Sequence, residues 1–253
     1  MEFKYTIEKM YCHGVSDIVP VHNSPFFRYT ISMSRGILIT GNESSLLTAL
    51  CVEAAKRVEN YAVAFIPREQ DQEAPKVVPG DRRIILDWNP PSPVSAKTIL
   101  LACQNNMEHI DDAILVCVPP AYRKKAEDLS AIEIDRLIDC NIKGWFFLVR
   151  ELVAEFKKYG HGNLSMVLAS ELGSGSKEDQ TDLVGPIAVS AFRSFAQGIL
   201  LSSFDAAYNV MGFSMSEPGE ENAFAAYIFK TMEDEKKNSG KWHKYGKFGF
   251  LGR

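Results

Sequence analysis

The side chains best placed for chemistry come at the end of one apolar segment in the second half of the sequence and directly after it. Residues 165–170 read as a buried strand that ends on the hydroxyl of Ser170. The acids of the polar loop that follows include Glu171, Asp179 and Asp182. Parallel α/β sheets bind ligands where strands end in this way. The acids fit a solvated loop better than a catalytic cluster, so the stretch indicates where a site would lie without indicating a reaction.

Other reaction classes find little support in the residue pattern. A serine hydrolase would need a G-x-S-x-G turn, which the chain lacks. His161 lies in a turn before the expected fifth strand, at the end of the sheet away from Ser170. The remaining histidines show no metal-ligand spacing with Cys, Asp or Glu; they are His13, His22, His109 and His243. We therefore expect no metal site.

Composition sets the class of protein. The 253 residues, 46% hydrophobic and 24% charged, can bury the core of one α/β domain. A net charge of -4 and a pI near 5.8 give no reason to expect nucleic acid or an anionic membrane as a partner. Five spaced cysteines without a CxxC predict reduced thiols. No signal-peptide pattern is visible, and no run approaches the roughly 18 apolar residues of a membrane span, so we expect a cytoplasmic protein.

The elements that would position Ser170 alternate between apolar runs of strand length and stretches of helical period. The predicted strands are 36–40, 62–66, 83–86, 113–118, 164–169 and 210–214, with 247–251 as a weaker seventh. The predicted helices are 45–59, 92–107, 132–159, 189–207 and 221–237. This pattern predicts an α/β fold over residues 36–253, with a single Rossmann-like, doubly wound parallel sheet of about seven strands. Residues 1–35 stand apart as a β extension, in which 3–7 and 27–32 read as a hairpin.

Five short motifs follow one another in order from residue 36 onward. They are G-I-L-I-T-G at 36–41, I-I-L-D at 84–87, I-D-D-A-I-L-V at 110–116, C-N-I-K-G at 140–144 and S-E-P-G at 216–219. Each is weak alone. In this order and spacing they resemble the strand ends and turns of the short-chain dehydrogenase/reductase family, over roughly residues 35–253.

The resemblance implies a dinucleotide site whose phosphate turn is degraded. In the family turn T-G-x-x-x-G-x-G, this chain keeps Thr40 and Gly41, has Ser45 at the second glycine position and has Leu47 at the third. Glu43 adds an anion beside the expected phosphates. Because a large side chain and a negative charge both oppose a bound diphosphate, we expect no cofactor to be bound.

Further positions implied by the resemblance give mixed indications about NAD(P). Asp87 matches the acceptor for the adenine ring, and Pro218 matches the turn after the sixth strand. Arg68 follows the second strand, where it weakly favours NADP should a dinucleotide bind. Pro119 and Pro120 replace the small residues that border the nicotinamide in the family, and they remove two backbone donors.

The resemblance also implies four catalytic positions, of which two keep the family residue. Ser170 and Asn141 match the serine and the asparagine. Val189 holds the tyrosine position and cannot donate a proton. Arg193 holds the lysine position with a charge but without the lysine's compact, titratable head. The set of Ser170, Asn141 and Arg193 is therefore vestigial.

Two functions fit these observations. The first is a degenerate protein on this fold, a pseudoenzyme without dehydrogenase activity, which acts as a binding or assembly module. The alternative is a divergent NAD(P)-dependent oxidoreductase for a small carbonyl or alcohol, with a relocated proton donor such as Tyr122. Members of the family commonly pair through the helices that correspond to 132–159 and 189–207, so we expect a homodimer or homotetramer.

Overall fold

The computed structural model describes residues 18–20, 29–31, 35–58, 61–66, 83–119, 124–169, 183–216 and 219–246. The chain divides into two units, Met1–Ser34 and Arg35–Arg253. In the first unit, β1 (Ile18–Pro20) pairs antiparallel with β2 (Tyr29–Ile31). The second strand lies within predicted strand 27–32, whereas β1 lies in the segment that the sequence pattern assigns to the connection. Predicted strand 3–7 lies outside the described residues.

The second unit is built on a seven-stranded parallel sheet in the order β5-β4-β3-β6-β7-β8-β9. Its strands are β3 (Ile37–Gly41), β4 (Tyr61–Phe65), β5 (Arg83–Asp87), β6 (Asp112–Cys117), β7 (Asn163–Leu168), β8 (Asn209–Met215) and β9 (Trp242–Tyr245). The strand order reverses between β3 and β6, as in a doubly wound sheet. The predicted fold class is therefore confirmed. The seventh described strand is β9, which the sequence pattern does not predict. The predicted strand 247–251 lies outside the described residues, so it stays a prediction.

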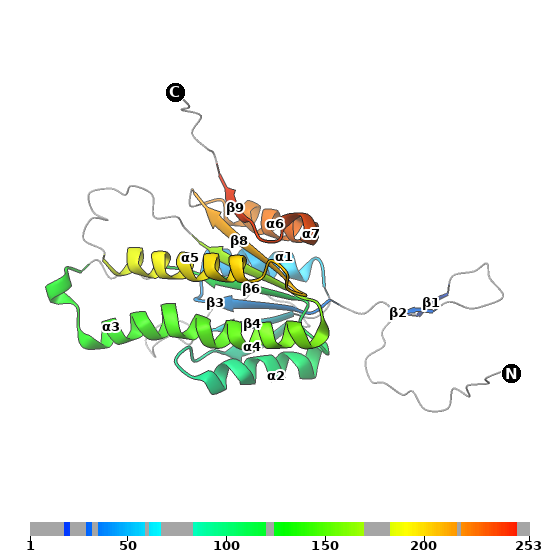
Figure 1. Ribbon diagram of the computed structural model, residues 1–253, viewed down its shortest axis with the longest axis horizontal. Coiled ribbons are helices and arrows are strands. Elements are labelled where there is room, and N and C mark those ends of the chain that lie inside the picture. Colours follow the sequence, from blue (N-terminus) through cyan, green and yellow to red (C-terminus); the bar gives the residue numbers. More distant parts are fainter. Residues whose placement is uncertain are drawn as a thin grey trace, which may run out of the picture. The chain divides into compact units, whose positions relative to one another are not determined.

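Helices cover both faces of this sheet (Figure 1). They are α1 (Ser45–Ala55), α2 (Pro93–Met107), α3 (Ala131–Ile138), α4 (Gly144–Tyr159), α5 (Val184–Ser202), α6 (Glu221–Met232) and the short α7 (Glu235–Asn238). The core forms two layers. One lies between the sheet and α2, α4 and α5, and the other between the sheet and α1 and α6.

The strands supply both layers because successive side chains point to opposite faces. On β3, Leu38 packs in the layer of α2, α4 and α5, while Ile37 and Ile39 pack in the layer of α1 and α6. On β6, Leu115 and Val116 divide in the same way. Since both faces are covered, these strands are continuously apolar, and for this reason they could be predicted from the sequence.

The predicted helix 132–159 is present, but it is interrupted. A capping box between Ser130 and Glu133 starts α3. One π-helical turn, Asp139–Lys143, then separates α3 from α4. Such turns insert a residue into an α-helix and often occur at functional sites. The turn contains Asn141, one of the predicted catalytic residues.

Helix α5 (Val184–Ser202) begins five residues before the predicted start at 189 and ends before the predicted end at 207. By length and composition alone this helix is apolar enough to cross a membrane. No apolar run of that length was expected from the sequence. In this fold α5 packs against β7 and β8. Its apolar face, which includes Ala188, Phe192 and Ala196, is buried in the core. A helix that covers a sheet passes the same compositional test.

Candidate functional site

The predicted phosphate turn joins β3 to α1, and the packing of the strands already requires its glycine. Gly41 has a φ of 151°, and a Cβ on it would lie 2.3 Å from the carbonyl oxygen of Val116 on β6. Any side chain here would collide with the neighbouring strand, whatever the turn binds. Thr40 beside it is fully buried, and its hydroxyl has no hydrogen-bond partner among the described residues.

One of the N-terminal backbone N–H groups of helix α1 is already hydrogen-bonded within the chain. Ser44 is the N-cap, and its Oγ accepts the backbone N–H of Leu47 at 3.1 Å. Amides of this kind are what a helix N-terminus offers to a phosphate. Ser45 is exposed, whereas Leu47 is 1% exposed and packs in the layer of α1 and α6. Leu47 therefore faces the core instead of the space above the turn, so the expectation that its side chain opposes a bound diphosphate is wrong. Ser44 instead takes one of the amides that a helix N-terminus offers to a phosphate.

A cavity of about 600 Å³ lies between the loop after β5 and helix α3. Trp88 and Pro90 line it from the loop, and Asp135 and Arg136 line it from α3. Asp87, the predicted adenine acceptor, is exposed at the end of β5, directly before Trp88. The cavity offers a mostly apolar wall and both signs of charge, which suits a small polar molecule.

Two packed tryptophans back this cavity. The ring centres of Trp88 and Trp145 are 4.9 Å apart, and those of Trp145 and Phe192 are 5.2 Å apart. Both indole N–H groups are buried without a hydrogen-bond partner among the described residues. A buried Trp N–H normally finds a partner, and an unsatisfied donor costs about 1–3 kcal/mol. Two indole N–H donors beside the cavity therefore have no acceptor among the described residues.

The asparagine motif C-N-I-K-G has a packing explanation. Asn141 is 7% exposed in the π-helical turn, and this turn packs against α5. Gly144 starts α4 where a Cβ would lie 2.5 Å from the Cβ of Pro90. The glycine lets α4 approach the loop after β5, and the asparagine lies beside the helix that carries residues 189 and 193.

The two remaining catalytic positions on α5 are engaged in packing. Val189 is 8% exposed and belongs to the core. The guanidinium of Arg193 lies 5.4 Å from the ring centre of Trp242 on β9. Trp242 in turn donates its indole N–H to Ser214 at 3.0 Å, over Gly212, where a Cβ would come within 2.1 Å of the ring. Arg193 thus ties α5 to the edge of the sheet.

The structure brings only some of the predicted site residues together. Thr40, Gly41 and Ser45 lie at the end of β3, and Asp87 lies two strands away at the end of β5. Asn141 lies next to α5, while Arg193 reaches the other edge of the sheet. Ser170, Arg68 and Pro218, together with Pro120 and Tyr122, lie outside the described residues, so their roles stay predictions.

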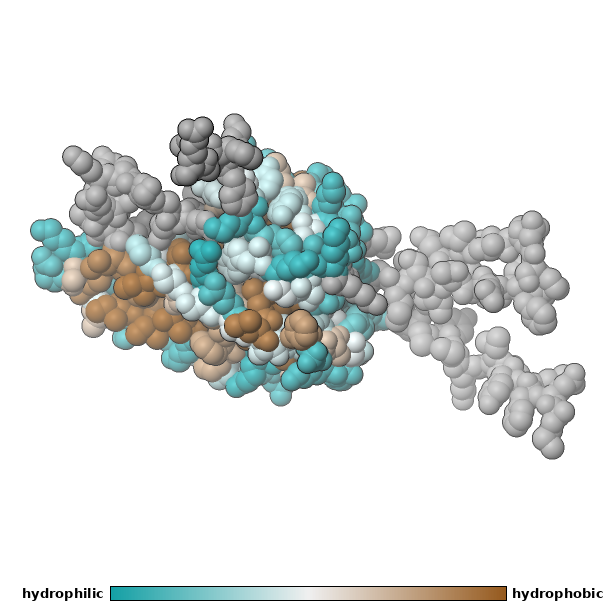
Figure 2. Space-filling model, turned by 45° about the horizontal axis from the view of Figure 1, so that its top comes forward, coloured by the Kyte–Doolittle hydropathy of each residue, from teal (hydrophilic) through white to brown (hydrophobic). Residues whose placement is uncertain are grey.

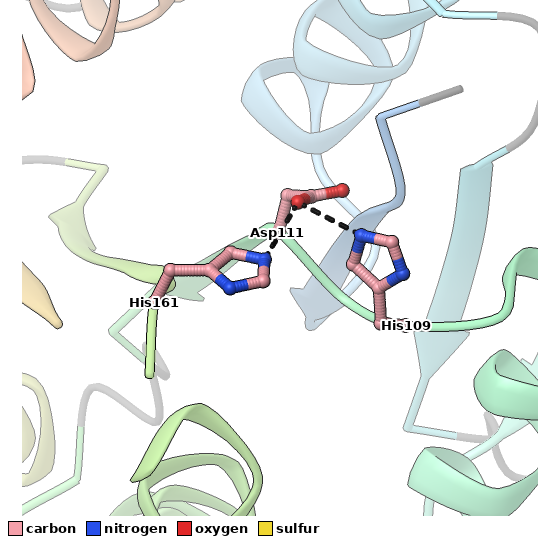
Figure 3. A group of neighbouring side chains, drawn as sticks. All are labelled: His109, Asp111 and His161. Atoms are coloured by element: carbon pink, nitrogen blue, oxygen red, sulfur yellow. Dashed lines mark hydrogen bonds and ion pairs between the residues drawn. The ribbon is translucent and has the colours of Figure 1, made fainter. Parts of the chain in front are cut away.

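A second group of side chains at the amino edge of the sheet was missed by sequence reasoning. His109 and His161 each place Nε2 3.2 Å from Oδ1 of Asp111 (Figure 3). The expectation that these histidines lack metal spacing considered each segment alone. Because β6 and β7 are neighbours, with Asp112 opposite Asn163, the loops that enter them meet. The neighbouring positions of these two strands in a doubly wound sheet were the signal that could have revealed the group.

A buried polar network lies next to this group. Asp112 is 1% exposed, binds the guanidinium of Arg35 through both carboxylate oxygens and accepts from Asn163 at 2.9 Å. Asn163 accepts in turn from Asn209 at 3.0 Å. Burial raises the pKa of the Asp112 carboxyl, and Arg35 opposes that rise. The network joins the amino ends of β6, β7 and β8.

Solved structures of dehydrogenases share this architecture. A short chain dehydrogenase from Mycobacterium smegmatis matches with a TM-score of 0.67 at 14% identity, over 85% of this chain and 92% of that chain. One from Bacillus anthracis gives 0.66 at 13% identity, over 83% and 94%. Serine dehydrogenase from Escherichia coli gives 0.63 at 16% identity, over 83% and 96%. No protein-family model and no curated protein matches the sequence.

These likenesses extend over most of each chain at sequence identities of 13–16%. They therefore concern the course of the backbone, and the strand order and helix layers described above agree with them. The described part of the second unit has the fold of these short-chain dehydrogenases.

Proposed function

We propose that this chain is a non-catalytic protein on a dehydrogenase scaffold, which uses the fold to bind and assemble and not to transfer hydride. The proposal rests on how the side chains at two positions of α5, 189 and 193, are packed. Hydride transfer to a carbonyl needs a titratable donor that faces the substrate. Val189 is buried in the core and Arg193 stacks on Trp242, so both positions serve packing.

The phosphate turn supports the same proposal. Ser44 takes an amide of α1 that a diphosphate would need, and Leu47 fills the space between α1 and the sheet. The surviving Gly41 is required by Val116 alone. Gly41, Ser44 and Leu47 therefore each have a role in the fold that does not involve a cofactor.

A second copy of the chain is the proposed partner, through α4 and α5. Phe146 is 56% exposed on α4, and its ring centre lies 4.4 Å from that of Phe195 on α5. Leu183 and Ile187 are also exposed, at the four-residue spacing that continues the Phe195 side of the helix. Figure 2 shows a band of hydrophobic surface on one side of the molecule. Large exposed apolar patches of this kind favour association.

Other aromatic residues on α4, on α5 and just after α5 divide between core and surface. Trp145, Phe156 and Phe192 are at most 3% exposed in the single chain, so they need no partner. Phe204 is 87% exposed near the end of α5. Phe146 and Phe204 are therefore the aromatic side chains that a second copy would bury.

A divergent oxidoreductase remains the second candidate, and the cavity beside Trp88 favours it. This cavity lies at the carboxyl edge of the sheet and has room for a small ligand. Two unsatisfied indole donors, those of Trp88 and Trp145, lie behind it. A ligand there would have to reach the reacting atoms without the usual tyrosine.

Equilibrium titration of the purified protein with NAD, NADH, NADP and NADPH separates the two functions. We expect no saturable binding up to millimolar cofactor. The double variant V189Y/R193K should remain folded by circular dichroism and should still fail to oxidise NAD(P)H with carbonyl substrates, because the phosphate turn is unchanged. Variant V189F/R193K is the matched control, because it adds nearly the same bulk to the core without the hydroxyl. Saturable micromolar binding, or turnover by the double variant, would favour the oxidoreductase.

A further inference from the structure

We propose that His109, Asp111 and His161 form a binding site for one divalent transition-metal ion of the zinc class. Their ligand atoms lie within 4.8 Å of one another. Both imidazole rings face the same carboxylate oxygen (Figure 3). The residues come from two loops, one that leads from α2 to β6 and one that leads from α4 to β7. The site lies at the amino edge of the sheet, away from the cavity and the phosphate turn, so it is independent of the proposed function.

The distances match those between ligands of a shared ion. Zinc binds His nitrogen and carboxylate oxygen at about 2.0–2.2 Å in tetrahedral geometry, which puts two ligand atoms roughly 3.3–3.5 Å apart. Each Nε2 lies 3.2 Å from Oδ1 of Asp111. The two histidine nitrogens lie within 4.8 Å of each other, so the exposed His161 ring would turn toward His109 when an ion binds.

Asp111 is held in place independently of the histidines. Its second carboxylate oxygen, Oδ2, accepts the backbone N–H of Gly36 at 2.7 Å. Its own N–H donates to the carbonyl of Gly36 at 2.9 Å, and its carbonyl accepts the N–H of Asn163 at 2.8 Å. Metal-binding carboxylates are oriented by such outer hydrogen bonds. Oδ1 is therefore fixed toward the two histidines before any ion binds.

The surroundings of His161 favour a cation beside its Nε2. Nδ1 of His161 lies 3.3 Å from the carbonyl oxygen of Tyr159, and Nε2 lies 3.2 Å from Oδ1 of Asp111. A ring whose Nδ1–H donates to this carbonyl turns the lone pair of Nε2 toward Asp111, where it can bind a metal ion. Metal-binding histidines typically donate their other N–H to a carbonyl in this manner.

The turns on either side set the histidines in position. A γ-turn at Glu108, with φ 63°, ends α2 and is closed by a bond from the N–H of His109 to the carbonyl of Met107 at 2.7 Å. His161 stands between Gly160 and Gly162, both with positive φ. Its side chain is 51% exposed. Solvent can therefore supply the fourth ligand, because three protein ligands leave one tetrahedral position open.

The ligand types select the ion. Two imidazoles with one carboxylate suit Zn²⁺ and Co²⁺, whereas Mg²⁺ and Ca²⁺ prefer a full set of oxygen ligands. Untagged protein, cleared of metals with a chelator and then freed of the chelator, should bind one Zn²⁺ per chain in a calorimetric titration. Co²⁺ should give the visible absorption of a low-symmetry complex, and Mg²⁺ should give no heat. Zn²⁺ should also raise the unfolding temperature, since it binds the folded chain.

Variants decide whether these residues are the ligands. H161Q is the main variant, because its half-exposed ring can be replaced without unfolding the chain, and it should weaken Zn²⁺ binding by at least about 10-fold. H109Q should do the same. The matched control H13Q/H22Q removes two histidines elsewhere in the sequence and should leave the affinity within a factor of about two. Zinc binding that survives H161Q and H109Q, or that disappears in H13Q/H22Q, would overturn the proposal. Absence of zinc binding by the unchanged protein would do so as well and would leave a hydrogen-bonded His-Asp-His contact.

Discussion

At the scale of single residues, the contact of Arg193 with Trp242 depends on three residues, Gly212, Ser214 and Arg193 itself. Gly212 leaves the space in which the indole ring lies, and Ser214 accepts its N–H. The planar guanidinium then covers the ring at 5.4 Å. A guanidinium stacks on an aromatic face better than an ammonium does, which explains an arginine at this position in terms of packing.

Replacing Arg193 by lysine should therefore destabilise the protein although the charge is kept. The expected loss is about 0.5–1 kcal/mol in free energy of unfolding, with a change in tryptophan fluorescence. R150K is the matched control, since Arg150 lies over Phe147 at 5.7 Å with a 61% exposed side chain. That variant should stay within about 0.5 kcal/mol of the unchanged protein. Equal effects of the two substitutions in urea unfolding would contradict the role given to Trp242.

The buried thiols should be unreactive in the folded protein. Burial raises the pKa of Cys51, Cys103 and Cys117 from 9.0 to about 12, so almost no thiolate is present at pH 8. Iodoacetamide at pH 8, followed by peptide mass spectrometry, should leave these three unlabelled until the chain is unfolded. Cys140, which is only partly buried, should react sooner. Rapid labelling of the three before Cys140 would be inconsistent with this core.

The same thiols make stability depend on alkaline pH. The folded pKa lies above the unfolded value of 9.0, so the folded state holds the proton more tightly. This contribution is fully present below pH 9 and is lost as the pH rises from 9 toward 12. Urea unfolding should therefore show a lower midpoint at pH 10.5 than at pH 8, and replacing Cys103 by alanine should reduce that difference.

At the scale of elements, the junction of the π-helical turn with α4 depends on a missing side chain. G144A should force the new methyl against Pro90, where a Cβ would lie 2.5 Å away, and should cost about 1–3 kcal/mol. Gly198 in α5 is the control, because a Cβ there meets nothing within 4 Å. G198A should stabilise the helix by up to about 1 kcal/mol. Thermal unfolding of the two variants should shift in opposite directions.

The elements that could be predicted are those whose sequence is dictated by burial on both faces. Strands β3, β6, β7 and β8 were found as continuous apolar runs for this reason. β9 at the sheet edge has only four residues, of which His243 and Lys244 are polar, and Arg193 shields Trp242, so hydrophobicity gives a weak signal for this strand. The π-helical turn could not be predicted either, because one inserted residue leaves the apolar face of the helix almost unchanged.

The candidate sites differ in how far sequence could lead to them. A turn after the first strand was predicted and joins β3 to α1, but the direction of Leu47 depends on which face of α1 meets the sheet. The group of His109, Asp111 and His161 depends on the pairing of β6 with β7 and on the turns before each strand. Pairing between distant segments is a tertiary property that spacing along one segment cannot reveal.

At the scale of the whole molecule, the exposed face of α4 and α5 predicts self-association. F146R should convert a dimer into a monomer at micromolar concentration, because it places an unpaired charge in the proposed isologous contact. Leu101 on α2 is 48% exposed and outside that face, so L101R is the matched control and should leave the mass unchanged. Light scattering checks both. A monomeric unchanged protein would remove the second copy as the proposed partner.

The strand order also has a consequence for synthesis on the ribosome. β3 is made early and pairs with β4 at once, but its other neighbour is β6, in which Leu115 lies opposite Thr40. At about 5–20 residues per second, that partner emerges on the order of 4–15 s later. During this interval the apolar edge of β3 is open, and α1 and the β4–β5 half can form around it first. The nascent chain therefore exposes one edge of a strand that is fully buried in the folded protein, and chaperone binding should be greatest before β6 has left the exit tunnel.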